Sequence, residues 1–191
     1  MKENDTPHAQ MLDPNTTALV VVDLQAKLMP AVEDAEQVLR NTQLLIRLAQ
    51  VLELPTVLTS QYPKGLGRIV PEITECAAGV EPIEKTSFGC FGEPGFLQQL
   101  KQRAPKATCL LLAGVESHIC VAQTALGALQ AGYVVHVAAD AVSSRSASNR
   151  EIGLGRMGRA GVVVSSTEMM VYELLGTSSR PEFKAMLPYL K

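Results

Sequence analysis

The chain alternates between short apolar runs and segments with a helical spacing of apolar residues. Residues 18–22 form a continuous apolar run, and residues 32–52 then carry Val38, Leu45 and Leu48 on one expected helix face. A continuous run indicates a strand buried on both faces, whereas a 3.6-residue repeat indicates an amphipathic helix. The alternation further predicts strands at residues 56–59, 82–86, 109–115, 133–139 and 162–165, and helices at residues 96–103, 117–131, 147–159, 168–175 and 183–187.

Apolar strands that alternate with helices predict a mostly parallel sheet with helices on both faces. We expect a three-layer α/β/α sandwich on a doubly wound, mostly parallel six-stranded sheet of Rossmann-like type. The 191 residues fit one compact domain at residues 16–191, preceded by a polar N-terminal tail at residues 1–15. Residues 61–73 contain glycines and prolines, which predict a long loop with a turn of helix.

The composition narrows the range of partners. The chain is 47% hydrophobic, has a net charge of −2 and lacks a basic tract, so we expect neither nucleic acid nor a membrane as a partner. No apolar stretch approaches the ~20 residues that span a bilayer, and the tail lacks a signal-peptide core. The four cysteines show no C-x-x-C spacing, which is typical of free thiols in a cytoplasmic protein.

Residues with chemical potential lie where three of the predicted strands end. Asp23 follows the first strand, Lys85 ends the third, and Cys120 lies in the first turn of the helix after the fourth. In a doubly wound sheet these strand ends face the ligand, so we expect the three side chains to converge. A helix N-terminus and a nearby ammonium both favour thiolate over thiol. Cys120 is therefore the candidate nucleophile, and we expect it to react with alkylating agents faster than the other three cysteines.

Together these side chains have the parts needed to cleave an acyl bond. A thiolate nucleophile needs a proton acceptor, a stabilising cation and donors for the oxyanion. We assign Asp23 as general acid and base, Lys85 as charge stabiliser, and backbone N–H groups around Glu116 and Cys120 as oxyanion donors. The alternatives are that Asp23 is a turn residue, that Lys85 is a solvated charge beside Glu84, and that Cys120 is a small residue packed under a helix.

The chain resembles the isochorismatase-like cysteine hydrolase superfamily in three motifs, V-V-D-L-Q at residues 21–25, E-K-T-S-F at 84–88 and G-V-E-S-H-I-C-V-A-Q-T-A at 114–125. It resembles one branch, the isochorismatase domain-containing proteins, in S-Q-Y-P-K-G-L-G at 60–67 and D-A-V-S-S-R-S at 140–146. The motifs occur in the family's order from the first strand to the C-terminal part of the chain. Jointly they are highly specific.

The resemblance implies a catalytic triad, which falls here on Asp23, Lys85 and Cys120. It also implies a cis peptide bond between Val115 and Glu116, beside the expected oxyanion donors. The same resemblance, and the prevalence of symmetric assemblies among compact enzymes, predict a homo-oligomer of at least two chains. The fairly apolar segment at residues 169–190 is a candidate interface, with packing inside one chain as the alternative.

We expect no metal and no other cofactor. Nicotinamidases of the superfamily bind a metal through an aspartate and closely spaced histidines after the second strand, but residues 60–68 contain neither histidine nor carboxylate. Some isochorismatases that cleave vinyl ethers lack the cysteine, so Cys120 favours acyl chemistry. The predicted activity is hydrolysis of a small amide or related acyl compound through a Cys120 thioester. The alternatives are vinyl-ether hydrolysis with Asp23 as proton donor, and a non-catalytic binding or scaffold module on the same fold.

Five further residues are weaker candidates for the pocket. Tyr62, Phe88 and Phe91 fall in loops over the expected site, where aromatic residues are equally often mere packing. Gln25 is a candidate supporting residue. His118 precedes the cysteine by two positions and so points to a different helix face, which favours a pocket-lining or core position over a Cys–His pair.

Residues 153–158 read G-L-G-R-M-G, the spelling of a dinucleotide-binding loop. That loop must follow a strand directly, whereas these residues lie inside a predicted helix. We therefore interpret the glycines as positions where the helix packs closely against a neighbour.

Overall fold

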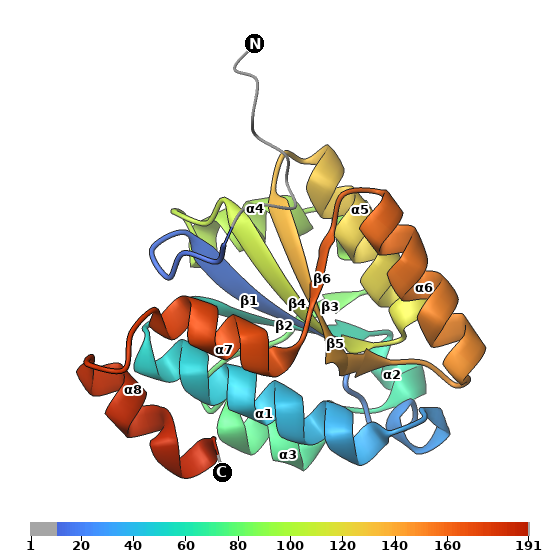
Figure 1. Ribbon diagram of the computed structural model, residues 1–191. Coiled ribbons are helices and arrows are strands. Elements are labelled where there is room, and N and C mark those ends of the chain that lie inside the picture. Colours follow the sequence, from blue (N-terminus) through green and yellow to red (C-terminus); the bar gives the residue numbers. More distant parts are fainter. Residues whose placement is uncertain (1–10, 191) are drawn as a thin grey trace.

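The computed structural model describes residues 11–190, so the first ten residues of the expected N-terminal tail lie outside the described part. Six strands form one parallel sheet in the order β3-β2-β1-β4-β5-β6 (Figure 1). The order reverses between β1 and β4, which confirms the doubly wound prediction. The strands are β1 (Thr17–Val22), β2 (Thr56–Gln61), β3 (Ile83–Lys85), β4 (Cys109–Val115), β5 (Val134–Ser143) and β6 (Val163–Ser165).

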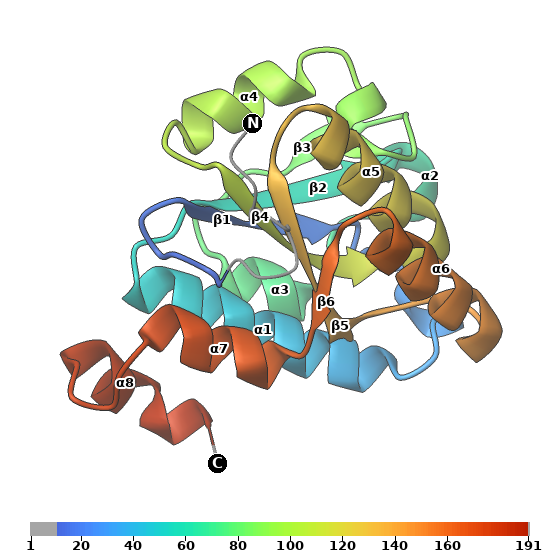
Figure 2. The same cartoon turned by 45° about the horizontal axis from the view of Figure 1, so that its top comes forward.

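Helices cover both faces of the sheet and complete the predicted three layers. Figures 1 and 2 show α1, α3 and α7 against one face and α4, α5 and α6 against the other, with α8 beyond α7. The helices are α1 (Ala35–Val51), α2 (Pro63–Leu66), α3 (Pro71–Cys76), α4 (Phe96–Arg103), α5 (Ala122–Gln130), α6 (Ala147–Arg159), α7 (Thr167–Leu175) and α8 (Pro181–Met186), and short 3₁₀ turns occur at Met29–Ala31, Cys90–Gly92 and Leu187–Tyr189.

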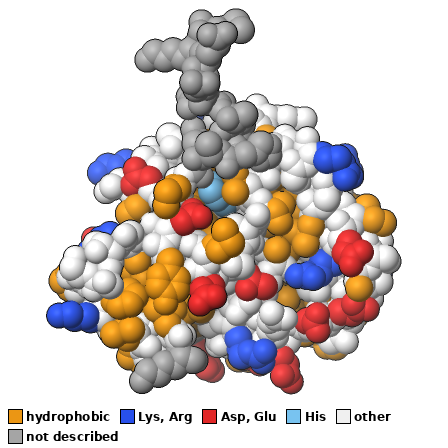
Figure 3. All heavy atoms as spheres, viewed as in Figure 1, with side chains coloured by type: hydrophobic (Ala, Val, Ile, Leu, Met, Phe, Trp, Pro, Cys, Tyr) orange, Lys and Arg blue, Asp and Glu red, His pale blue; other side chains and the backbone are white. Residues whose placement is uncertain are grey.

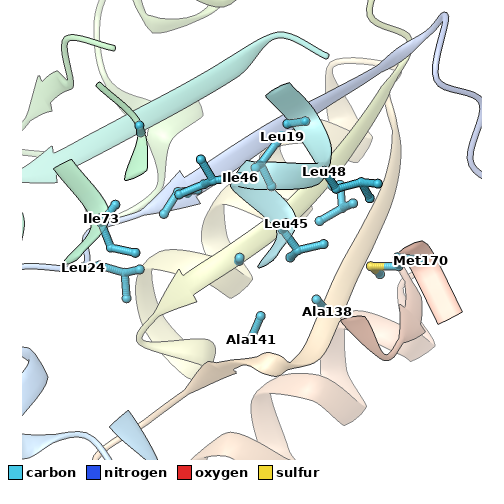
Figure 4. Packing of buried hydrophobic residues seen from close by; sticks show 14 of the residues in the cluster. Leu19, Leu24, Leu45, Ile46, Leu48, Ile73, Ala138, Ala141 and Met170 are labelled. Atoms are coloured by element: carbon cyan, nitrogen blue, oxygen red, sulfur yellow. The ribbon is translucent and has the colours of Figure 1, made fainter. Parts of the chain in front are cut away.

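The continuous apolar runs of β1 and β4 arise because both central strands are covered on both faces. Every residue of the two strands is buried. Along β1, Leu19 and Val21 belong to the core under α1, while Ala18, Val20 and Val22 belong to the core under α4 and α5. Figure 4 shows the first of these cores, with side chains of β1 facing those of α1. Each fully buried aliphatic side chain contributes about 1.5–3 kcal/mol, so these strands anchor the domain.

Two regions differ from the sequence prediction. Residues 61–73 contain two helix starts instead of a single helical turn, because Pro63 and Pro71 each begin a short helix, where a missing N–H is tolerated. Strand β5 continues to Ser143, beyond the predicted end at residue 139. Its register against β4 shifts around Asp140, whose carboxylate accepts hydrogen bonds from the N–H and hydroxyl of Thr167 at the start of α7. A polar residue inside this bulge hid the second half of the strand.

The surface seen in Figure 3 carries both acidic and basic side chains. Apolar side chains gather over α7 and α8. Met169 and Tyr172 on α7, and Leu187 and Tyr189 on the 3₁₀ turn that follows α8, are each at least two-fifths exposed. We call these four residues the α7–α8 patch. Within residues 11–190, every helix is too short or too polar to cross a bilayer.

Gly114 sets how closely β1 and β4 approach each other just before the site. Its φ is +118°, and a Cβ atom at this position would lie 2.0 Å from the carbonyl oxygen of Val22. Only glycine avoids both the backbone strain and the clash. The residue that follows β1 is Asp23, so the close approach fixes where that side chain leaves the backbone.

We predict that Gly114→Ala lowers the free energy of unfolding by at least about 2 kcal/mol more than Gly132→Ala. Gly132 has a comparable positive φ of +88° but nothing within 4 Å of its ideal Cβ, so it serves as a control for strain alone. Urea unfolding followed by circular dichroism measures both variants. Equal losses of stability would contradict the close-approach argument.

Candidate active site

The centre of the site is a buried ion pair. The Lys85 Nζ lies 2.6 Å from Asp23 Oδ2, and both side chains are fully shielded from solvent. The second carboxylate oxygen of Asp23 accepts a hydrogen bond of 2.8 Å from the Thr59 hydroxyl. Lys85 is therefore not the solvated edge charge of the alternative interpretation, because its side chain is buried whereas Glu84 is exposed.

The ammonium of Lys85 is held from several sides. Besides Asp23 it donates to Gln61 Oε1 at 2.7 Å and to the carbonyl oxygens of Phe88 at 2.9 Å and Ser87 at 3.2 Å. An ammonium has three N–H donors, so these four acceptors engage all of them. Within the described residues, Lys85 can bind a substrate directly only by releasing one of these partners. Its position favours a role in holding the charge on Asp23.

Asp23 lies where β1 ends and the chain turns. Its φ is +51°, in the left-handed region that aspartate tolerates better than most residues, and its carbonyl accepts a hydrogen bond from the Gln25 N–H. The turn points its carboxylate towards the ends of β2 and β3, where Thr59 and Lys85 bind it. Asp23 is thus a turn residue and an ion-pair partner at once.

Cys120 lies in a π-helical segment, Ser117–Val121, that leads from β4 into α5. The predicted helix therefore begins with a wider turn, in which the N–H groups of Ile119 and Val121 both donate to the carbonyl of Glu116. Such segments recur at functional sites because they redirect side chains relative to a regular helix. Here Cys120 is 6% exposed, and its thiol lies close enough to Asp23 and Lys85 for both charges to influence its pKa.

The environment of Cys120 corrects one sequence prediction. Burial, followed by the negative charge of Asp23, raises the pKa of Cys120 to about 12, and the opposing effect of Lys85 is smaller. The expected activation to a thiolate is wrong for the resting protein, because the lysine charge is already matched by Asp23. At neutral pH the site holds a thiol next to a carboxylate that can take its proton.

Helix α6 packs tightly on the segment that carries Cys120. A Cβ atom at Gly153 would lie 2.9 Å from the Cα of His118 and 2.9 Å from the carbonyl oxygen of Ser117. Residues 153–158 lie wholly inside α6, in agreement with the packing interpretation of this glycine-rich stretch. Gly153 thereby lets α6 pack directly against the backbone of the π-helical segment.

The segment is also tied to the loop after β5. The peptide bond between Val115 and Glu116 is cis, as the resemblance implies. The Glu116 carboxylate accepts hydrogen bonds from the N–H of Arg145 at 2.9 Å and from its Nε at 3.0 Å, and these bonds hold the pKa of Glu116 below its usual range. The side chain of Glu116 thus anchors the segment, while its backbone remains the candidate oxyanion donor.

The weaker candidates do not form one pocket. Phe88 and Phe91 line an open cleft of about 580 Å³ beside α5, whereas Tyr62 lines a separate cleft of about 260 Å³. Phe91 also packs edge-on against Phe96, with ring centroids 5.2 Å apart, which favours the packing alternative for this residue. His118 hydrogen-bonds through Nδ1 to the hydroxyl of Ser144 at 2.9 Å.

The sequence analysis assigned no role to Gln61. The side chain is buried and contacts the ammonium of Lys85 directly. Its neutral amide offers no chemical signal in a sequence. The register could have indicated it, because Gln61 is paired with Lys85 across β2 and β3. Gln25, a low-ranked candidate, is part of the same network.

No group of three or more His, Cys, Asp or Glu side chains is placed to hold a metal ion within residues 11–190. The expectation of a metal-independent protein stays a prediction.

The reversed strand order, the buried acid–lysine pair after β1 and the cysteine after β4 together define an α/β protein of isochorismatase type. The model of the Isochorismatase domain family matches residues 17–169, and the chain belongs to this family. Mouse isochorismatase domain-containing protein 2B is 37% identical over 178 residues, which cover 93% of this chain and 82% of the mouse protein.

Solved structures share the whole fold. The MAR1 ribonuclease of Caenorhabditis elegans superimposes with a TM-score of 0.88 at 35% identity, covering 95% of this chain and 92% of that one. YcaC of Pseudomonas aeruginosa, solved with hexane-2,5-diol and covalent acrylamide, has a TM-score of 0.87 at 28% identity with the same coverages. Escherichia coli YcaC, described as an octameric hydrolase of unknown specificity, has a TM-score of 0.86 at 27% identity, covering 94% and 90%.

The raised pKa of Cys120 predicts how its alkylation depends on pH. Only the thiolate reacts, so the rate of modification by iodoacetamide should rise about tenfold per pH unit from pH 7 to 9. A free thiol with the reference pKa of about 8.5 levels off in this range and serves as control. Peptide mapping by mass spectrometry gives the rate for Cys120 alone. A rate that is already constant between pH 7 and 8 would mean that the resting site holds a thiolate.

Proposed function

We propose that the protein is a metal-independent cysteine hydrolase that cleaves a small amide or a related acyl compound. The observation that carries this proposal is the buried ion pair of Asp23 with Lys85, beside the buried Cys120 thiol, whose pKa both charges influence. A nucleophile, a base in contact with it and a group that orients the base form the usual pattern of covalent catalysis. In this chain all three are buried where the parallel strands β1, β3 and β4 end.

In the first half of the reaction, Asp23 takes the proton of Cys120 as sulfur attacks the substrate carbonyl carbon. The high pKa of the resting thiol means that proton transfer accompanies the attack and does not precede it. The carbonyl oxygen gains a negative charge, for which backbone N–H groups around Glu116 and Cys120 are the candidate donors. The tetrahedral intermediate then expels the amine, which receives its proton from Asp23, and a thioester remains on Cys120.

In the second half, Asp23 removes a proton from a water molecule that attacks the thioester carbonyl. The C–S bond breaks, the carboxylic acid leaves, and the proton returns to the Cys120 sulfur. Throughout, Lys85 stays bonded to Asp23 and to the carbonyls of the following loop, so its charge compensates the carboxylate in each resting state. The buried pair therefore supplies a base whose orientation does not need to change between the two halves.

Two structural neighbours support this chemistry in outline. The E. coli YcaC protein is described as a hydrolase, and the P. aeruginosa protein holds acrylamide covalently. Acrylamide is a small amide and an electrophile, so it is a suitable probe for a nucleophile in a narrow site. The C. elegans neighbour carries a ribonuclease name, so the exclusion of nucleic acid stays a prediction. A short single-stranded RNA therefore belongs in the substrate panel beside small primary amides.

We predict that Cys120→Ala, Asp23→Asn and Lys85→Ala each lower kcat on a responsive amide by at least about 10³-fold, as losses of groups acting as one unit do. The double variants should be little worse than the single ones. Cys109→Ala, a change of a buried thiol at the far end of β4, is the matched control. Mass spectrometry of the quenched wild type should detect an acyl adduct on the Cys120 peptide.

Retention of activity by Cys120→Ala would instead support vinyl-ether hydrolysis with Asp23 as proton donor. Activity on RNA that survives in Asp23→Asn would point to a different site. A wild type that turns over no member of the panel, but binds one of them, would favour the non-catalytic module.

We further propose that the protein forms a homo-oligomer, with the α7–α8 patch in the interface. The exposed apolar side chains of Figure 3 and the octameric state described for E. coli YcaC support this proposal. Compact enzymes are commonly symmetric assemblies, and such interfaces cover apolar surface.

Light scattering at micromolar concentration should give at least twice the mass of one chain. Tyr172→Glu should lower that mass because it places a charge in the patch. Ile152→Glu, a change of an exposed apolar residue on α6, should leave the mass unchanged. A monomeric wild type would contradict the proposal.

A further inference from the structure

Gln61 lies between the ion pair and the loop that covers it. Its side-chain Oε1 accepts the hydrogen bond of 2.7 Å from Lys85, and its Nε2 donates to the carbonyl of Thr86 at 2.8 Å. Both partners fix the orientation of the amide, since an ammonium only donates and a carbonyl only accepts. The side chain thus connects the ammonium of Lys85 with the backbone of Thr86, the residue that follows β3.

A second carboxamide holds Gln61 in place. The Gln25 Oε1 accepts a hydrogen bond from the N–H of Gln61 at 2.7 Å, and its Nε2 donates to the carbonyls of Gln61 at 2.9 Å and Gly67 at 2.7 Å. Gln25 is fully buried and Gln61 nearly so, at 0% and 7% exposure. A buried amide network with every bond satisfied is rigid, so the position of the Gln61 oxygen is defined on the side facing Lys85.

The charge of the group at position 61 matters more than its size. Lys85 and Asp23 form an ion pair with one positive and one negative charge. Gln61 gives the ammonium a further hydrogen-bond acceptor without adding a second negative charge. A carboxylate at this position would compete with Asp23 for the same ammonium. Two carboxylates beside one buried cation repel each other, and keeping both ionised costs free energy, so one of them would take a proton.

We propose that Gln61 is a positioning residue, whose neutral carboxamide holds the Lys85 ammonium on Asp23 and keeps Asp23 the sole anion of the pair. This inference deepens the proposed function and rests on it for the consequence in turnover. Its effect on Cys120 does not depend on the substrate, because the thiol senses the charges of Asp23 and Lys85 directly.

The test compares Gln61→Glu with Gln61→Met and with the matched control Gln50→Glu. Gln50 also donates its side-chain amide to a backbone carbonyl, that of Cys76, but lies on the surface of α1. When the introduced carboxyl at position 61 is protonated, its carbonyl can accept from Lys85 and its O–H can donate to Thr86, as the amide does. The variant should therefore behave like the wild type at low pH and differ from it once the carboxyl ionises.

The first readout is alkylation of Cys120 by iodoacetamide as a function of pH. An added negative charge disfavours the thiolate, so Gln61→Glu should react at least threefold more slowly than the wild type at pH 8–9. Gln50→Glu should follow the wild type throughout. The charged and titratable groups around position 61 are Lys85 and Asp23, the nearby thiol of Cys90, and Glu93, which binds the N–H of Thr86. These groups occur in all variants, so they cancel in the comparison.

The second readout is turnover of an amide that the wild type hydrolyses. For Gln61→Glu, kcat should fall as pH rises through the pKa of the introduced carboxyl, with KM little changed. Gln61→Met, which keeps the length but removes the acceptor, should lower kcat about tenfold at every pH. Circular dichroism and thermal unfolding confirm that each variant is folded.

Wild-type alkylation rates in Gln61→Glu at every pH would overturn the positioning role, as would equal kcat profiles. The two proposals fail in different ways. A wild type without amide turnover, but with the predicted slowing of alkylation in Gln61→Glu, overturns the proposed hydrolysis and supports the role of Gln61.

Discussion

The buried contact between Asp23 and Lys85 is the constraint around which the site is built. It links the central strand β1 to the edge strand β3 across β2, which adds the Thr59 hydroxyl. Taking two charges out of water costs several kcal/mol per ion unless good geometry and further hydrogen bonds offset it. The carbonyls of Ser87 and Phe88 supply such bonds, so the loop after β3 has to be closed whenever the ion pair is formed.

The same contact explains the state of the nucleophile. Burial and the charge of Asp23 raise the pKa of Cys120 by more than the Lys85 ammonium lowers it, so the proton stays on sulfur. In the mechanism that we propose, Asp23 is the base that removes this proton when a substrate enters.

Much of the fold follows from local sequence. The helices at residues 96–103 and 147–159 and the strand at 109–115 begin and end where the sequence predicted. The strand is a continuous apolar run, and the second helix is capped by Ser146, whose hydroxyl accepts the N–H of Asn149. The convergence of acid, lysine and cysteine was equally predictable, because parallel strands end at one edge.

The rest depended on contacts between distant parts of the chain. The direction of the pKa shift of Cys120 needs the depth of burial and the order of the charges, neither of which a sequence contains. The extension of β5 past Asp140 needs the partner on α7 that binds its carboxylate. Gln61 became visible only through the lysine it contacts, because glutamine occurs widely in loops and helices without such a role.

Strand β3 has three residues and lies at the edge of the sheet, bound to β2 alone. Edge elements with few contacts open more often than the centre of a domain, in local fluctuations that leave the rest folded. An opening of β3 would take Lys85 with it and leave Asp23 without its counter-ion. The three residues of this edge strand thus tie the integrity of the ion pair to the pairing of the sheet edge with β2.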